Sequence, residues 1–168
     1  MDTVGEKFSR HEFYIPEMLI AARAMQAGIA LLKPALAAQG GGKPRAKVVI
    51  GTVKGDLHDI GKNLVALMLQ GGGFEVLDLG ADVKPDAFVA AVRRMQPHFV
   101  MMSALLTTTM LAMKETIDAL HAAGVRSHVR VAIGGAPVTQ RFCDEIGADF
   151  YAATAIGAVT RAKELLVG

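Results

Sequence analysis

An α/β fold, with a parallel sheet covered by helices on both faces, is the class that this sequence predicts. Over residues 47–168, five short runs rich in β-branched and apolar residues alternate with five stretches of helical periodicity. The runs at 47–53 and 98–104 are almost continuously apolar, which is typical of strands buried on both faces. This alternation indicates parallel βαβ units rather than hairpins.

The five strands and five helices follow one another along the chain. The expected strands are KVVIGTV (47–53), FEVLDLG (74–80), HFVMMSA (98–104), VRVAIGG (129–135) and DFYAA (149–153). The expected helices cover residues 61–70, 85–95, 110–123 and 138–146, and a last helix ends at Val167. The right-handed crossover rule and the size of the domain favour the flavodoxin-like (Rossmann-like) doubly wound strand order 2-1-3-4-5.

The residues before the first strand have a different composition. Residues 15–39 are rich in Ala, Leu and Met at helical spacing, and we expect them to form a helix in two pieces, broken by Gly28 and Pro34. Residues 40–46 (GGGKPRA) have the glycine and proline content of a linker. We therefore divide the chain into a helical segment (1–39), a linker (40–46) and the sheet domain (47–168).

Composition and charge exclude several classes of partner. The chain has 168 residues, a net charge of +2 and no basic block, so neither nucleic acid nor an anionic membrane surface is indicated. No apolar run approaches the ~18 residues of a membrane-spanning helix, and the N-terminal residues lack the pattern of a secretory signal. The single cysteine, Cys143, excludes an internal disulfide framework. We expect a cytoplasmic protein with a small-molecule or protein partner.

A histidine with a carboxylate two positions before it follows the first strand. The segment GTVKGDLHDIGKN (51–63) contains Asp56 and His58. In the strand order 2-1-3-4-5, ligands bind beyond the carboxyl ends of the first and third strands, so this loop should meet the loop that begins at Ser103. Imidazole binds transition metals, and a carboxylate on its other nitrogen orients it, so we expect a chain from Ser103 through Asp56 to His58. One imidazole cannot build a zinc site, so a macrocycle must supply most of the coordination.

Three sequence blocks together carry a family resemblance. The blocks are D-x-H-x-x-G, S-x-L and G-G, and they contain Asp56, His58, Gly61, Ser103, Leu105, Gly134 and Gly135. The intervening segments, 62–102 and 106–133, also match the family spacing. The chain resembles the cobalamin-binding domain of corrinoid proteins in methyl-transfer systems, which are related to the cobalamin-binding module of methionine synthase.

The resemblance implies a mode of cofactor binding. The benzimidazole tail of cobalamin would leave cobalt and insert into the sheet domain, and His58 would replace it as the lower ligand of the metal. Glycines would allow the backbone to approach the cofactor closely, and side chains near Ser103 would line the tail pocket. These further contacts are assigned to Gly61, Gly134, Gly135, Leu105 and Thr107.

The N-terminal segment distinguishes between two branches of the family, methyl-transfer corrinoid proteins and mutase subunits. Residues 4–34 are similar to the end of the helical cap that precedes the sheet domain in methyl-transfer corrinoid proteins, a cap that mutase subunits lack. Phe8 and Ile15 fall where apolar side chains of the cap cover the upper face of the corrin. The family cap is a four-helix bundle, whereas residues 1–39 suffice for about two helices. Either the chain is a fragment, or a second copy completes the cap in a homodimer.

The resemblance implies a methyl carrier with no catalytic residue of its own. Its partners would be a substrate-specific methyltransferase, an acceptor methyltransferase and a reductive activator, and the cofactor would supply the chemistry. One alternative is the cobalamin-binding subunit of an adenosylcobalamin-dependent mutase. Another is a cofactor-free, receiver-like interaction module. A receiver requires an aspartate at the end of the third strand, where this chain reads MMSALL (101–106).

Overall fold

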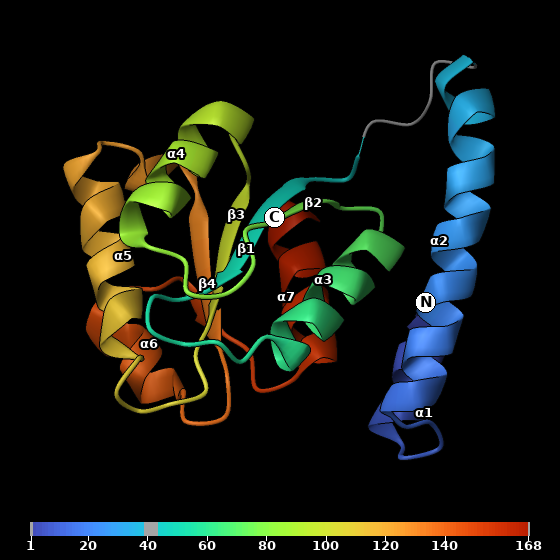
Figure 1. The fold of residues 1–168 in the computed structure, drawn as a ribbon, viewed down its shortest axis with the longest axis horizontal. Coiled ribbons are helices and arrows are strands. Elements are labelled where there is room, and N and C mark those ends of the chain that lie inside the picture. Colours follow the sequence, from blue (N-terminus) through green and yellow to red (C-terminus); the bar gives the residue numbers. More distant parts are fainter. Residues whose placement is uncertain (1, 39–43, 168) are drawn as a thin grey trace.

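A five-stranded parallel sheet forms the centre of the fold (Figure 1). The structure is a computed structural model that describes residues 2–38 and 44–167. Its strands are β1 (Lys47–Thr52), β2 (Glu75–Asp78), β3 (Phe99–Ser103), β4 (Arg130–Gly134) and β5 (Phe150–Tyr151). All pairings are parallel, in the order β2-β1-β3-β4-β5, so the predicted fold class and strand order are confirmed.

Helices cover both faces of the sheet (Figure 1). One face carries α4 (Pro85–Met95), α5 (Leu111–Ala122) and α6 (Gln140–Ile146), and the other carries α3 (Ile60–Gly71) and α7 (Ala155–Val167). A short 3-10 turn, η1 (Arg126–His128), precedes β4. Val49 and Val100 pack toward the first group of helices, whereas Val48 and Phe99 pack toward the second. Because both faces are buried, the central strands are apolar without interruption.

A helical hairpin of α1 (Asp2–Ser9) and α2 (Ile15–Ala38) lies outside α3 (Figure 1). Met18 of α2 is fully buried in the same apolar cluster as residues of α3 and α7. The prediction of two helical pieces is wrong, because α2 is continuous through Gly28 and Pro34. Alanine, leucine and methionine are strong helix formers, and a proline removes only one bond of the ladder.

The chain enters the sheet domain just before β1. Residues 39–43, which include most of the predicted linker, lie outside the described residues. Arg45 donates its backbone N–H to the carbonyl of Gly73 at 2.9 Å, and Ala46 is buried. No helix within 2–38 and 44–167 combines the length and the apolar character needed to cross a bilayer.

The register of the sheet aligns the carboxyl ends of three strands. Thr52 at the end of β1 pairs with Ser103 at the end of β3, and Ser103 pairs with Gly134 at the end of β4. The direction of winding reverses between β1 and β3, which is where ligands bind in sheets of this type. The loops after β1 and β3 therefore converge on one place at the edge of the sheet.

Candidate functional site

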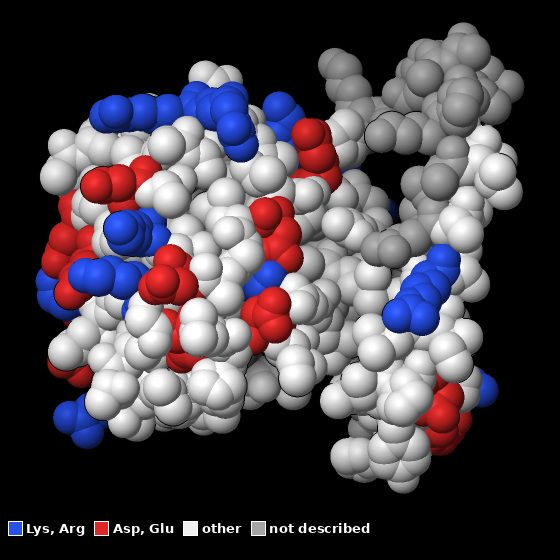
Figure 2. Space-filling view, viewed as in Figure 1, with Lys and Arg blue, Asp and Glu red and all other residues white. Residues whose placement is uncertain are grey.

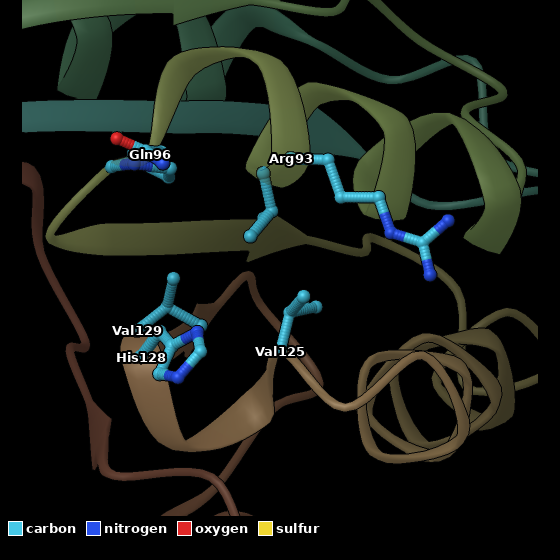
Figure 3. A pocket seen from close by; sticks show the side chains of 7 residues that line it. Arg93, Gln96, Val125, His128 and Val129 are labelled. Carbon is cyan, nitrogen blue, oxygen red and sulfur yellow. The ribbon is translucent and has the colours of Figure 1, made fainter.

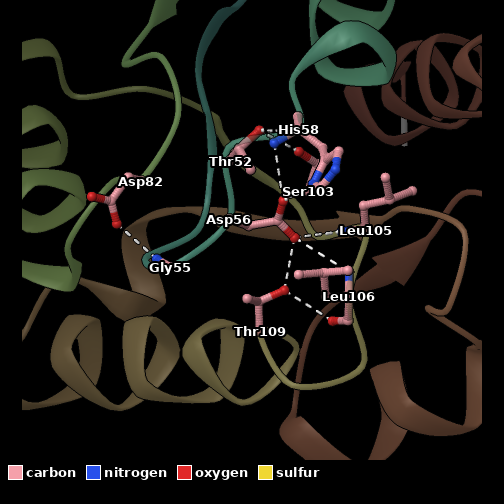
Figure 4. Close-up of polar contacts among 9 residues, drawn as sticks. All are labelled: Thr52, Gly55, Asp56, His58, Asp82, Ser103, Leu105, Leu106 and Thr109. Carbon is pink, nitrogen blue, oxygen red and sulfur yellow. Dashed lines mark hydrogen bonds and ion pairs between the residues drawn. The ribbon is translucent and has the colours of Figure 1, made fainter.

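The loop after β1 folds into a turn that buries Asp56. The backbone N–H of Asp56 donates to the carbonyl of Val53 at 3.1 Å, and Oδ1 of Asp56 accepts from the backbone N–H of His58 at 3.0 Å. The connection between β2 and α4 supports the turn, because Asp82 Oδ1 accepts from the N–H of Gly55 at 2.7 Å (Figure 4). Asp82 also donates its N–H to the carbonyl of Asp56 at 3.0 Å. The turn is thus held by its own bonds and by a neighbouring loop.

The structure brings the side chains of Asp56 and His58 into direct contact. Asp56 Oδ1 lies 2.8 Å from His58 Nδ1. The Asp56 side chain is fully buried, whereas that of His58 is 53% exposed. An ionised carboxylate only accepts hydrogen bonds, so Nδ1 carries a proton, and in the neutral imidazole the lone pair is then on Nε2. A half-exposed imidazole in this tautomer is a suitable ligand for a transition metal.

The hydroxyl group bound to Asp56 comes from Thr109. Thr109 Oγ1 donates to Asp56 Oδ2 at 2.7 Å, whereas Ser103 Oγ lies 2.8 Å from Thr52 Oγ1 (Figure 4). Thr52 Oγ1 donates to the carbonyl of His58 at 3.0 Å, so Ser103 is the donor to Thr52. The predicted chain from Ser103 to Asp56 is wrong. Ser103 is the last residue of β3 and pairs with Thr52. The chain after β3 comes within hydrogen-bond distance of Asp56 only from Leu105 onward.

Asp56 remains ionised although it is buried. Its Oδ2 also accepts from the backbone N–H groups of Leu105 at 2.7 Å and Leu106 at 3.3 Å. Burial raises the pKa of Asp56, but hydrogen bonds from Leu105, Thr109 and His58 outweigh it and hold that pKa well below its usual range. A fixed negative charge therefore lies behind the imidazole and orients it.

Exposed apolar side chains and open space accompany His58. Leu57 precedes it on its own loop, Ile60 begins α3, and Leu105 and Leu106 lie on the loop after β3; all four are large apolar residues exposed at the surface. A Cβ atom at Gly61 would have no neighbour within 4 Å. We refer to these four exposed leucine and isoleucine residues as the apolar rim of the site.

The two predicted glycines at the end of β4 lie against protein backbone. A Cβ at Gly134 would lie 3.0 Å from the carbonyl oxygen of Ala152. Gly135 has a φ of +126°, and a Cβ there would lie 1.9 Å from the carbonyl oxygen of Ala104. The G-G block thus has a structural requirement of its own, in addition to any contact with a ligand.

The other predicted site residues lie in two places. Leu105 and Thr107 are exposed on the loop after β3. Phe8 is partly buried against the apolar cluster that α3 and α7 share, and Ile15, at the start of α2, is exposed. Their roles in binding a cofactor stay predictions.

Several residues that build the site were not predicted from the sequence. Besides Thr52, Thr109 and Asp82, an ion pair with a buried lysine joins α3 to β2. The ammonium of Lys62, whose side chain is 1% exposed, lies 2.6 Å from Oδ1 of the partly exposed Asp78. Thr109 is the last of three consecutive threonines before α5, and this run could have indicated a hydroxyl group close to the site. Nothing in the sequence marks Asp82 or the Lys62–Asp78 pair.

His58 has no cluster of protein ligands beside it. Within residues 2–38 and 44–167, no group of three or more His, Cys, Asp or Glu side chains could hold a metal ion. A separate cavity of about 350 Å³ lies near the amino ends of β3 and β4, away from His58 (Figure 3). It is lined by Val92, Arg93, Gln96, Pro97, Val125, His128 and Val129. A metal at His58 would need a cofactor for its remaining ligands.

Comparison with known proteins identifies the family. Residues 46–160 match the family model described as the B12 binding domain, and residues 1–33 match a second model with the same description. Dimethylamine corrinoid protein 1 from Methanosarcina mazei is 45% identical over 168 residues, which is 100% of this chain and 78% of that protein. The chain belongs to the B12-binding corrinoid proteins of methyltransferase systems. Its cofactor is cobalamin.

Further relatives of this corrinoid protein support the same family assignment. The trimethylamine corrinoid protein from Methanosarcina barkeri is 45% identical over 167 residues, 99% of this chain and 77% of the relative. The crystal structure of the methanol:cobalamin methyltransferase complex MtaBC from Methanosarcina barkeri matches with a TM-score of 0.89 at 33% identity, over 98% of this chain and 62% of that chain. A cobalamin-binding protein from Desulfitobacterium hafniense DCB-2 matches with a TM-score of 0.82 at 41% identity, over 98% of this chain and 77% of that chain.

Receiver domains, the basis of the receiver-like alternative, resemble this chain in fold only. The receiver domain of the putative response regulator NarL from Mycobacterium tuberculosis matches with a TM-score of 0.54 at 18% identity, over 75% of this chain and 99% of that chain. The residues around His58 instead fit a corrinoid. They provide one free imidazole nitrogen, an apolar exposed rim and open space at Gly61.

Thr109→Val should destabilise the corrinoid protein without cofactor more than Ser103→Ala does. Valine matches threonine in shape but removes a buried hydrogen bond to a carboxylate, which should lower the free energy of unfolding by about 2 kcal/mol. Ser103 bonds to a neutral hydroxyl, so its loss should cost about 1 kcal/mol or less. Urea unfolding at pH 7 measures both values. A larger loss in Ser103→Ala would contradict the assignment of Thr109 to Asp56.

Proposed function

We propose that this corrinoid protein binds cobalamin base-off with His58 as the lower ligand, and carries a methyl group between two methyltransferases. The observation that supports this is the Asp56–His58 pair, in which Nδ1 is engaged at 2.8 Å, so that Nε2 is the ring nitrogen left to bind a metal. When bound, the corrinoid supplies a cobalt atom that accepts and releases a methyl group. The chain supplies binding, orientation and shielding.

Asp56 has the task of presenting His58 in one tautomer and one orientation. Its Oδ1 binds both the backbone N–H and the ring of His58, while Oδ2 is held by Thr109, Leu105 and Leu106. A carboxylate fixed by this many donors cannot rotate away from the ring. The imidazole is therefore oriented before any ligand arrives, which reduces the ordering required on binding.

Further cofactor contacts are proposed on both sides of the corrin. Below it, glycines and loop residues close to His58 would contact the ring and the tail, and above it the helical hairpin would cover the methyl group. The residues concerned are Gly61, Ser103, Leu105, Thr107, Gly134, Gly135, Phe8 and Ile15.

The partners proposed are a substrate-specific methyltransferase, an acceptor methyltransferase and a reductive activator. Relatives of this chain are named for dimethylamine and trimethylamine, so methylated amines are the first donors to test. A role in an adenosylcobalamin-dependent mutase is less well supported. The match at residues 1–33 and the names of the relatives both favour methyl transfer.

Electron paramagnetic resonance of the Co(II) form of the bound cobalamin tests the proposed lower ligand. We expect protein labelled with ¹⁵N-histidine and loaded with unlabelled cobalamin to give a two-line nitrogen splitting, because the ligand nitrogen then has spin one half. Protein labelled with ¹⁵N-lysine serves as the control and should keep the three-line pattern of ¹⁴N. A three-line pattern in the histidine-labelled protein would show that the benzimidazole remains on cobalt.

A further inference from the structure

The cavity at the amino ends of β3 and β4 lies at the opposite edge of the sheet from His58. Its volume is about 350 Å³, and it opens between the end of α4 and the turn η1 (Figure 3). The five residues of β3 extend over about 16 Å from one edge of the sheet to the other. The cavity is therefore distinct from the site around His58.

The inner lining of the cavity is apolar. Val92 and Val129 are buried members of the core cluster on this face of the sheet, and Val125 packs against that cluster. Pro97 is buried as well. An apolar cavity of about 150 Å³ can hold benzene, so this cavity has room for a ring with substituents. An apolar lining with a few polar groups is typical of small-molecule sites.

Three exposed polar side chains, those of Arg93, Gln96 and His128, complete the lining. The Arg93 guanidinium donates to the carbonyl of Ala123 at 3.3 Å, and so reaches from α4 to the end of α5. A guanidinium has five N–H donors, and among the described residues this is the one hydrogen bond that the Arg93 side chain makes. Its other donors are available to a ligand. The described residues that line the cavity include no aspartate or glutamate that would compete for them.

The surface around the cavity is basic. Arg93 and Arg94 lie in the last turn of α4, and Arg130 begins β4. Asp149, just before β5, is already paired with Arg126 at 2.8 Å. Figure 2 shows Lys and Arg side chains gathered at the top of the view, along the edge where the strands begin. A surface of this sign attracts anions.

We propose that this cavity binds a small organic anion, with its apolar body against the valines and its carboxylate on Arg93. A guanidinium matches the geometry of a carboxylate and can bind it through two parallel hydrogen bonds. Gln96 and His128, which come from opposite walls of the cavity, can bind a second polar group of the ligand (Figure 3). Such a ligand would join the end of α4 to η1.

Nuclear magnetic resonance of the full chain, labelled at the valine methyl groups, tests the site with benzoate as the probe. We expect benzoate to shift the signals of Val92, Val125 and Val129, with a dissociation constant in the millimolar range because the probe has few atoms. Benzamide has the same shape without the charge, and inorganic phosphate has charge without an apolar body. Each should bind at least about tenfold more weakly than benzoate.

Two arginine variants test the assignment of the carboxylate. Arg93→Gln removes the proposed partner of benzoate and should weaken its binding at least about tenfold. Arg94→Gln is the matched control, because Arg94 is exposed in the same turn of α4 but does not line the cavity. It should change the dissociation constant by no more than about twofold, since salt screens exposed charges. Urea unfolding shows whether both variants are folded.

Three results would overturn the proposal. The first is the absence of any shift of the three valines at benzoate concentrations far above the millimolar range. The second is equal binding of benzamide or phosphate, which would mean that shape or charge alone is sufficient. The third is an equal loss in Arg93→Gln and Arg94→Gln, which indicates general attraction to the basic edge. The measurement requires neither cobalamin nor His58, so its failure is distinguishable from failure of the proposed function.

Discussion

Replacing His58 by alanine leaves cobalamin bound but changes its visible spectrum, if the imidazole is the lower ligand of cobalt. The variant loses the nitrogen ligand, so the absorption bands of the bound cofactor should shift toward those of a form without it. The apolar rim and the loop backbone are unchanged, so we expect the dissociation constant to rise by no more than about tenfold, or about 1.4 kcal/mol. Absorption spectra after gel filtration of the loaded protein measure both properties.

His121→Ala provides the matched control for this experiment. His121 lies near the end of α5 and is exposed, so the spectrum and the retention of colour should equal those of the native protein. An unchanged spectrum in His58→Ala would refute the axial-ligand assignment. Complete loss of colour would show that the imidazole carries most of the binding energy, which contradicts the expected retention.

Gly135→Ala should have the largest effect on stability. A Cβ at this position would lie 1.9 Å from the carbonyl oxygen of Ala104, and φ is +126°, where alanine is strained. The neighbouring backbone cannot shift freely, because Ala104 donates its N–H to the carbonyl of Gly134 at 3.2 Å. We expect the free energy of unfolding to fall by more than about 4 kcal/mol, a large part of the stability of a typical domain. Urea unfolding of the protein without cofactor measures the loss.

Gly124→Ala is a control that separates the effect of a steric clash from the effect of a positive φ angle. Gly124 also has a positive φ, +70°, but a Cβ there would have no neighbour within 4 Å. Alanine should cost about 1–2 kcal/mol at this position, the usual penalty for the left-handed conformation. Equal losses in the two variants would mean that close contact with Ala104 is unimportant.

The sheet domain could be predicted almost completely from the sequence. The predicted helix at 85–95 has the bounds of α4, three others differ from the structure by at most two residues at either end, and the last ends at Val167 as predicted. The reason is physical: strands buried on both faces are apolar throughout, their helices follow a period of 3.6 residues, and right-handed crossovers leave few possible strand orders. The same local argument overestimated the effect of Pro34, since the flanking residues of α2 keep the helix continuous.

Only part of the site could be predicted in the same way. Asp56 and His58 are two residues apart, so their bond follows from a turn formed within one loop, and the sequence by itself determined it. Strand order further implied that this loop meets the one after β3. Strand order did not predict which hydroxyl group bonds to Asp56. That hydroxyl group belongs to Thr109, whose position depends on the path of the loop after β3.

The tertiary structure decided the contacts between segments that lie far apart in the chain. It assigned Thr109 rather than Ser103 to Asp56, placed Asp82 against the turn and paired Lys62 with Asp78. It also gave Gly135 a role in packing that the motif alone did not suggest. Such contacts depend on distances between segments far apart in the chain, and no periodicity or local propensity encodes those distances. The sequence determined that Asp56 and His58 meet in one turn, and the fold determined which neighbours hold them in place.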